Sequence, residues 1–151
     1  MAHFAKLSST NIVEAVIVVA DAKTGGGNLD TESVGISFCQ NHWNATYGES
    51  DTIWKQTSYN KNFRGNYAGI GATYMTGVRT LGVASTDVFI KQQPYPSWTI
   101  GINTATWYAP IPKPGLTTSQ MLARQDYTWQ EDAYQSDNTT GWALTAVGGS
   151  R

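Results

Sequence analysis

The sequence has a single cysteine, Cys39, among its 151 residues. One thiol cannot form an internal disulfide, which excludes the disulfide-stapled class of small secreted domains. His42 follows three residues later on the same predicted helix, but two ligands fall short of a structural zinc site, and a Cys–His nucleophilic pair would need a cleft and an orienting third residue. We therefore interpret Cys39 as a buried apolar residue and expect neither a metal nor another cofactor.

Charge is also scarce. Charged residues make up 14% of the chain and the formal net charge is −1, against about 25% charged residues in a typical soluble domain. This balance argues against a nucleic-acid-binding protein, which should carry a basic patch, and against attachment to anionic membrane by charge. The polar surface consists instead of Ser, Thr, Asn, Gln and Tyr, which suits contact with other protein or with sugar.

Long apolar runs are missing as well. The longest, residues 12–20, is interrupted by Glu14 and is too short to span a membrane. His3 and Lys6 interrupt the start of the chain, so it does not resemble a secretory signal. We expect the protein to be made and folded in a reducing cytoplasm, with no membrane partner.

Catalytic constellations are equally absent. The Gly69-Ile70-Gly71 segment lacks the third glycine and the βαβ context of a dinucleotide site. Glu131 and Asp132 are adjacent, so on a strand they would point to opposite faces, and a solvated loop over residues 131–140 is the better interpretation. The sequence predicts a protein that is not an enzyme.

The first half of the chain shows strand and helix patterns. Residues 2–7 and 12–19 predict a β-hairpin, because they alternate or are β-branched around a Ser-Ser-Thr-Asn turn. Residues 31–46 predict a helix with Glu32 in the first turn, Gly48 as terminator, and an apolar stripe formed by Val34, Ile36, Phe38, Cys39, Trp43 and Ala45. The triple glycine at 25–27 indicates a loop.

Residues 53–74 are the most aromatic stretch, and we interpret them as the scaffold of the fold. Trp54 and residues 57–59 predict one strand, residues 60–62 a turn, and residues 67–74 a second strand of the same sheet. Trp54 and Tyr67 are expected to be structural. Gly69 and Gly71 would share one side of that second strand, which indicates a bend or close packing by a large aromatic side chain.

The second half is rich in Trp and Pro. We expect a strand at residues 87–90, a Pro-Tyr-Pro-Ser turn at 94–97, a hairpin at 98–108, a proline-rich connector, a short helix within 116–125 capped by Thr118 or Ser119, and a Trp hairpin at 127–145. Four of the six tryptophans lie here with few long aliphatic residues. These aromatics can pack internally, stack on sugar, or contact a partner. The candidate partner-binding residues are Trp98, Trp107, Tyr108, Trp129 and Trp142.

The length supports one domain over residues 1–151. The expected fold is β-rich α+β: an antiparallel sheet with one main helix forms a body over 1–110, and 111–151 is a C-terminal extension with a Trp hairpin.

Four motifs, in order, carry a resemblance. They are the opening Met-Ala-His-Phe-Ala-Lys-Leu, the Trp54-Lys-Gln-Thr-Ser-Tyr-Asn60 segment, Phe63-Arg-Gly-Asn-Tyr-Ala-Gly-Ile-Gly71, and Pro94-Tyr-Pro-Ser-Trp98. Together they resemble a family of small virion structural proteins of tailed bacteriophages, found in cyanophages and phages of other aquatic bacteria. The similarity covers residues 1 to about 21 and 53 to about 110, and the chain departs from it by extra residues at 75–88 and 113–125.

The resemblance implies a particle component rather than an enzyme. The expected role is a capsid decoration or cement protein on the outer capsid surface, made in the host cytoplasm. Its expected partners are the major capsid protein and copies of itself, in a homo-oligomer such as a trimer. The alternative is a tail, neck or fibre-associated protein, with host-surface sugar as a candidate ligand.

Overall fold

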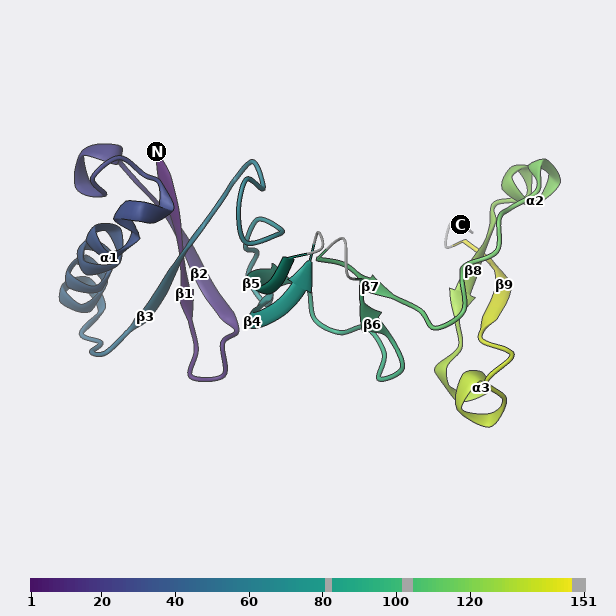
Figure 1. The fold of residues 1–151 in the computed structure, drawn as a ribbon. Helices are drawn as coiled ribbons and strands as arrows, with labels where there is room; N and C mark the ends of the chain where they lie inside the picture. The colour runs from purple at the N-terminus through teal and green to yellow at the C-terminus, as the bar shows by residue number, and fades with distance from the viewer. Residues whose placement is uncertain (81–82, 102–104, 148–151) are drawn as a thin grey trace. The chain divides into compact units, whose positions relative to one another are not determined.

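The computed structural model describes residues 1–80, 83–101 and 105–147, with the backbone alone for residues 78–80 and 83–86. The chain divides into two compact units: Met1–Gln92 with Ile100–Thr106, and Gln93–Thr99 with the chain from Trp107 onward. The fold is α+β, with antiparallel strand pairs, one main helix and Trp-containing C-terminal strands (Figure 1). The predicted fold class is therefore confirmed.

The first unit is built on a three-stranded antiparallel sheet, in the order β2–β1–β3. Its strands are β1 (Ala2–Leu7), β2 (Val13–Val19) and β3 (Ile53–Thr57). The predicted N-terminal hairpin is confirmed, with Ala2 opposite Val19 and a register shift between Lys6 and Leu7. Because β1 lies in the centre, its alternating side chains contribute to both faces of the sheet.

Helix α1 (Glu32–Tyr47) lies within one residue of the predicted helix and ends at Gly48, which has a φ of 68° and donates its N–H to the Asn44 carbonyl. Two short 3-10 helices, η1 (Asp21–Lys23) and η2 (Leu29–Thr31), precede it. The predicted stripe is partly wrong. Val34 is 49% exposed and Ala45 is exposed, whereas Gly35 and Cys39 are the buried residues of the helix.

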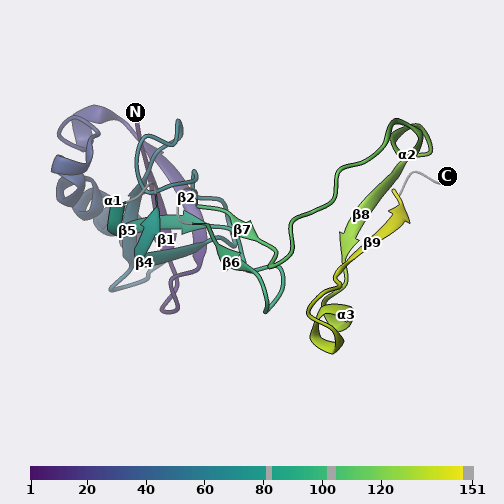
Figure 2. The same cartoon turned by 45° about the vertical axis from the view of Figure 1, so that its right-hand side comes forward.

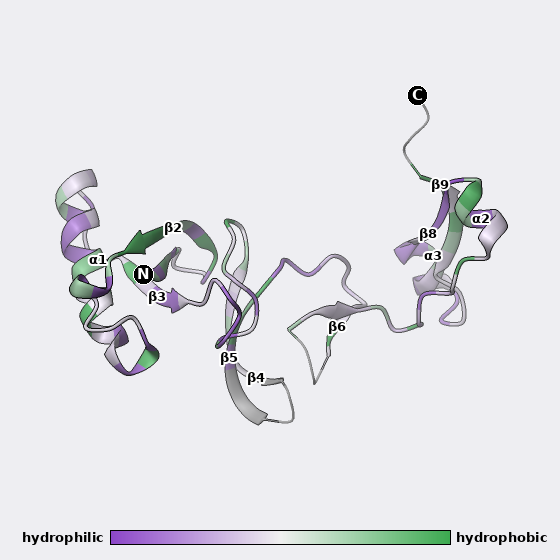
Figure 3. Cartoon of the chain, turned by 90° about the horizontal axis from the view of Figure 1, so that it is seen from above, coloured by the Kyte–Doolittle hydropathy of each residue, from purple (hydrophilic) through white to green (hydrophobic). Residues whose placement is uncertain are grey.

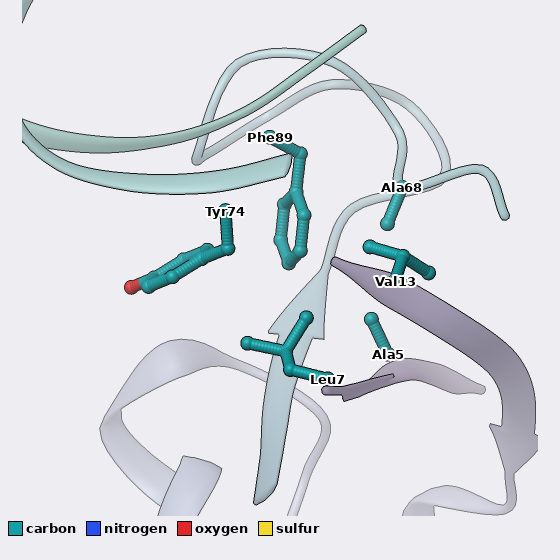
Figure 4. Close-up of a cluster of buried hydrophobic side chains, with 6 residues drawn as sticks. All are labelled: Ala5, Leu7, Val13, Ala68, Tyr74 and Phe89. Atoms are coloured by element: carbon teal, nitrogen blue, oxygen red, sulfur yellow. The ribbon is translucent and has the colours of Figure 1, made fainter. Parts of the chain in front are cut away.

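The two faces of the sheet carry separate cores. Phe4, Cys39 and Trp54 belong to the core on the α1 side, so the predicted burial of Trp54 is confirmed. The core of the other face is formed by Ala5, Leu7, Val13, Ala68, Tyr74 and Phe89 (Figure 4). The sheet is thus covered by a helix on one side and by later strands and loops on the other.

The prediction of a strand over residues 67–74 is wrong for residues 67–72, and only residues 73–74 lie in a strand. Residues 66–72 are irregular, Gly71 has a φ of 90°, and the Ala72 N–H bonds the Gly69 carbonyl in a turn. A Cβ built on Gly69 or Gly71 would meet nothing within 4 Å. These glycines therefore permit a turn and do not make room for an aromatic ring.

Strand β4 (Thr73–Thr80) pairs with β5 (Val83–Ile90) in a sheet of its own, so residues 73–74 do not extend the first sheet as expected. The first strand of the aromatic stretch is also shorter than predicted, because it ends at Thr57. Ser58 then closes the expected turn, accepting bonds from the N–H groups of Lys61 and Asn62.

The second unit contains two strand pairs and two short helices. Its elements are β6 (Thr99–Ile100), of which only Thr99 belongs to this unit, β7 (Trp107–Tyr108), α2 (Thr118–Leu122), β8 (Gln125–Trp129), α3 (Glu131–Ser136) and β9 (Trp142–Ala146). The predicted Trp hairpin is confirmed as β8 and β9, with α2 and α3 at its opposite ends (Figure 2). The turn expected between β6 and β7 falls on residues 102–104, outside the described residues.

Two local predictions in this unit are wrong. The cap of α2 is Thr117, whose side chain accepts the Gln120 N–H while the Gln120 side chain accepts the Thr117 N–H. This reciprocal pair is a capping box, which favours Thr117 over Thr118 or Ser119. Residues 131–136 form α3 rather than a loop, with two acidic residues in its first turn, where the helix dipole favours them.

Candidate interaction surface

Three tryptophans from three segments of the second unit form one ring cluster. Trp129 and Trp142 lie opposite each other on β8 and β9, with ring centroids 5.2 Å apart. Trp98 lies 6.0 Å from Trp129 and 6.1 Å from Trp142. Tyr95 contacts Trp98, and Tyr134 contacts Trp129. We call Trp98, Trp129 and Trp142 the Trp cluster; it is the aromatic centre of this unit.

Glu131 fixes the cluster from the start of α3. Its Oε1 accepts bonds from Trp129 Nε1 (2.8 Å) and Ser97 Oγ (2.7 Å), and its Oε2 accepts one from Gln135 Nε2. The bond from Trp129, followed by those from Ser97 and Gln135, holds the pKa of Glu131 below its usual range. The carboxylate thus ties residues 93–99 to the β8–β9 hairpin. The sequence interpretation missed this role, because it placed Glu131 in a solvated loop.

Trp142 is held on its other side by the proline-rich connector. Its Nε1 donates to the Ile111 carbonyl at 2.7 Å. Lys113 lies 5.9 Å from the Trp142 ring centroid and pairs with Asp126 at 3.0 Å. The hydrogen bond from Lys113 lowers the pKa of Asp126. The connector is therefore packed against the hairpin.

Trp98 has a buried indole Nε1 with no hydrogen-bond partner among the described residues. A buried donor without an acceptor costs about 1–3 kcal/mol. The unit tolerates this cost at the centre of its ring cluster.

The structure brings together three of the five candidate partner-binding residues. Trp129 is 5% exposed, so most of its ring is used inside the unit, and Trp98 and Trp142 are half-buried. Trp107 and Tyr108 form β7, where Tyr108 is exposed and Trp107 half-buried. The cluster therefore combines internal packing with some accessible aromatic surface.

The most exposed apolar side chains of this unit escaped the sequence interpretation. Leu122 is 80% exposed and Met121 is also exposed, both on α2. Val147 is exposed beside the same end of the hairpin, where its N–H bonds the Arg124 carbonyl. Leu144, three residues earlier on β9, is exposed as well. The sequence did contain a signal for these exposed residues. The capping box of Thr117 and Gln120 is followed directly by Met121 and Leu122, which places two apolar residues on a helix too short to bury them.

The first unit carries a separate open pocket of about 480 Å³. Tyr67, Asn66 and the exposed Ile70 line it, together with Lys61 and Gln92. Beside it, Tyr67, Tyr59 and His3 form a ring trio with centroid separations of 5.3–5.6 Å. Burial raises the pKa of Tyr67 and lowers that of His3. The lining therefore combines apolar side chains with amide and amine groups.

Cys39 and His42 do not form a pair. Cys39 is fully buried, and burial raises the pKa of its thiol to about 12. His42 is exposed and stacks on Phe38. Among the described residues, no group of three or more His, Cys, Asp or Glu side chains is placed to hold a metal ion.

No described helix combines the length and the apolar character needed to cross a membrane. No family model matches the sequence, and neither a curated protein nor a solved structure shows significant similarity to it.

Proposed function

We propose that the chain is a non-enzymatic virion structural protein of a tailed bacteriophage, and that it decorates the outer capsid surface as a cement protein. The sequence motifs that resemble phage virion proteins support the class. The observation that carries the binding role is the second unit: an aromatic body that leaves Leu122 and Met121 exposed on α2. Its partners would be the major capsid protein and further copies of this chain.

The second unit is a poor candidate for a free-standing domain. A two-stranded hairpin is marginally stable alone, and small cores bury too little apolar surface to offset chain entropy. The apolar side chains of α2 and the end of β9 gain stability when a partner covers them, by roughly 25 cal/mol for each Å² of apolar surface removed from water. Docking on a capsid would supply that cover.

The cement role rests on the repetition of one contact over the whole capsid surface. A contact that spans neighbouring capsid subunits and binds only the assembled shell stabilises the shell by mass action. Many copies of one modest contact give avidity when they are linked through the particle. Because the proposed surface is apolar and carries few charges, binding is expected to resist moderate salt.

The contact can be tested with full-length variants added to capsids assembled without the chain. Leu122→Lys should weaken capsid binding by at least about tenfold, as expected for a central apolar contact. Val34→Lys is the matched control, because Val34 is exposed on a helix of the first unit. Equal binding by the Leu122 variant and the unmodified chain would refute the assignment of α2 to the interface.

The copy number in purified particles tests the position on the virion. A cement protein repeats with the subunits of the capsid shell, whereas the copy number of a tail or neck protein is limited by the closed cyclic symmetry of its ring and is far lower. Quantitative mass spectrometry of purified particles measures this number. A count in the lower range would support the alternative role.

The alternative is a tail, neck or fibre-associated protein that binds host-surface sugar. The pocket of about 480 Å³ beside Tyr67 favours it, because it combines a tyrosine ring with amide and amine groups. Sugar sites use such combinations of apolar face and precisely placed polar groups. Glycan-array binding that is lost in Tyr67→Ala and retained in Leu122→Lys would favour this alternative.

A further inference from the structure

Strand β2 is an edge strand whose outer side is only partly covered. The order β2–β1–β3 leaves β2 without a second neighbouring strand in its sheet. Its first residue, Val13, exchanges main-chain bonds with Gly71 and Ala72. From Ala15 to its last residue, Val19, the strand contains no charged residue and no proline, and it is hydrophobic along much of its length (Figure 3). An unprotected edge of this composition favours pairing with another strand.

The register identifies the main-chain groups that face outward. Gln56 on β3 directs its N–H and C=O out of the sheet, where Glu32 and Arg64 bind them. Phe4 lies opposite Gln56 and also opposite Ile17. In an antiparallel sheet this alternation turns the main-chain groups of Ile17 inward and those of Val16 and Val18 outward. No strand of the described chain pairs with these outward groups.

The opposite edge of the sheet is protected. The Glu32 carboxylate accepts the Gln56 N–H at 2.7 Å, and the Arg64 guanidinium donates to the Gln56 carbonyl at 3.0 Å. Arg64 also pairs with the Glu32 carboxylate. These side chains cover the middle of β3, so β2 is the edge open to addition.

The side chains along β2 suit a second copy of the same strand. Val18 is 53% exposed on one face. On the α1 face, Ile17 and Val19 border a groove of about 330 Å³ whose aromatic wall is formed by Phe38, Trp43 and Tyr47. Another apolar β-branched strand laid against this edge would fill the groove and cover Val18.

Charge selects the antiparallel arrangement. Glu14 lies near the start of β2, and its carboxylate is on the α1 side, where it accepts a bond from Lys6. Lys23 lies just past the end of β2 and lines the groove on that same side. A two-fold axis between the two β2 strands brings the Glu14 end of each strand near the Lys23 end of the other. A parallel arrangement would instead align like charges.

We propose that two copies of the chain associate through β2, antiparallel and two-fold symmetric, to form a continuous six-stranded sheet. The register is centred on Ile17. Val16 of each copy exchanges main-chain hydrogen bonds with the second copy's Val18, and Glu14 lies opposite the second copy's Ala20. This isologous contact gives hydrogen-bond partners to the outward main-chain groups of both β2 strands. It concerns the first unit and does not depend on the capsid role.

A crosslink tests the register. In a non-hydrogen-bonded antiparallel pair the Cα atoms are about 4.5 Å apart, within the range of a disulfide. Full-length Ile17→Cys should form a disulfide-linked dimer under mild oxidation, mapped to position 17 by mass spectrometry. Val18→Cys is the matched control and should not crosslink, because the two copies of residue 18 are offset along the strands. Crosslinking of both variants, or of neither, would overturn the proposed register.

Self-association is measured independently by light scattering. The unmodified chain should show twice the 16.4 kDa chain mass. Val18→Lys should weaken dimerisation by at least about tenfold, because it places a charge in the apolar strand interface. Ile53→Lys is the control on the protected edge, where Ile53 is 42% exposed, and should leave the dimer unchanged. The proposal would be overturned if the unmodified chain were a monomer or a trimer, or if Val18→Lys left the strength of dimerisation unchanged.

Discussion

Gly141 lies directly against the six-membered ring of the Trp129 indole. A Cβ built on Gly141 would stand 2.3 Å from Cζ3 and 2.4 Å from Cη2 of that ring, far inside van der Waals contact. The glycine also accepts the Gln130 N–H at its carbonyl, so its backbone is fixed at the turn into β9. The packing of the Trp cluster therefore depends on the absence of a side chain at this position.

Gly141→Ala should destabilise the second unit. The methyl group must displace either the Trp129 ring or the hairpin backbone, and overpacking of this kind costs roughly 1–3 kcal/mol. Near-ultraviolet circular dichroism during thermal unfolding reports the loss of aromatic packing. Gly115→Ala is the control, because a Cβ there meets nothing within 4 Å. Equal melting temperatures for the two variants would show that the hairpin accommodates the added methyl group without loss of stability.

Two Trp→Phe substitutions in the Trp cluster should lower the free energy of unfolding by different amounts. Trp142→Phe removes the bond to the Ile111 carbonyl and leaves that acceptor without its donor, which is expected to cost about 1–3 kcal/mol beyond lost packing. Trp98→Phe removes a buried donor that has no partner among the described residues. Loss of this unfavourable group offsets part of the stability that the smaller ring loses in packing. Urea unfolding of both variants measures the difference. A larger loss for Trp98→Phe would contradict this account.

Acid should destabilise the first unit through Glu32. Burial opposes ionisation of this carboxylate, but hydrogen bonds from Arg64 and from the Gln56 N–H hold its pKa below the ordinary 4.5. The unfolded chain therefore binds the proton more readily. The resulting stability is complete above about pH 4.5 and is lost as the pH falls through the lower folded pKa.

The free energy of unfolding, measured against pH, checks this prediction. Glu32→Gln should flatten the slope of that curve below about pH 4.5, because it removes the group that takes up the proton. Asp30→Asn, at an exposed position two residues earlier, is the control for removing one carboxylate from this segment. Indistinguishable slopes for the unmodified chain and Glu32→Gln would assign the acid sensitivity to other carboxylates.

Cys39 should be chemically inert in the folded chain. Its side chain is fully buried and its thiol pKa is raised to about 12, so reaction with a thiol reagent at neutral pH should be at least about a hundredfold slower than in the unfolded chain. Cys39→Ser should cost about 1–3 kcal/mol through burial of a hydroxyl. Equimolar zinc in the purified protein, or rapid native labelling, would contradict this assignment.

Local patterns in the sequence determined much of the fold. The β-branched run of β2, the helix ended by Gly48 and the Trp-to-Trp pairing of β8 and β9 were all predictable, because each follows from neighbouring residues. The burial of Trp54 and Cys39 was predictable for the same reason, since apolar residues within such elements face a core.

Tertiary structure decided the features that depend on distant residues. Glycine at 69 and 71 suggested close packing, yet only the path of the chain shows that Gly71 serves a turn while Gly35 and Gly141 meet the rings of Phe4 and Trp129. Likewise, no local signal assigns Glu131 to Ser97, 34 residues away, or Arg64 to Glu32, 32 residues away. Propensity acts between near neighbours, whereas these contacts arise only when segments far apart in the sequence are packed together.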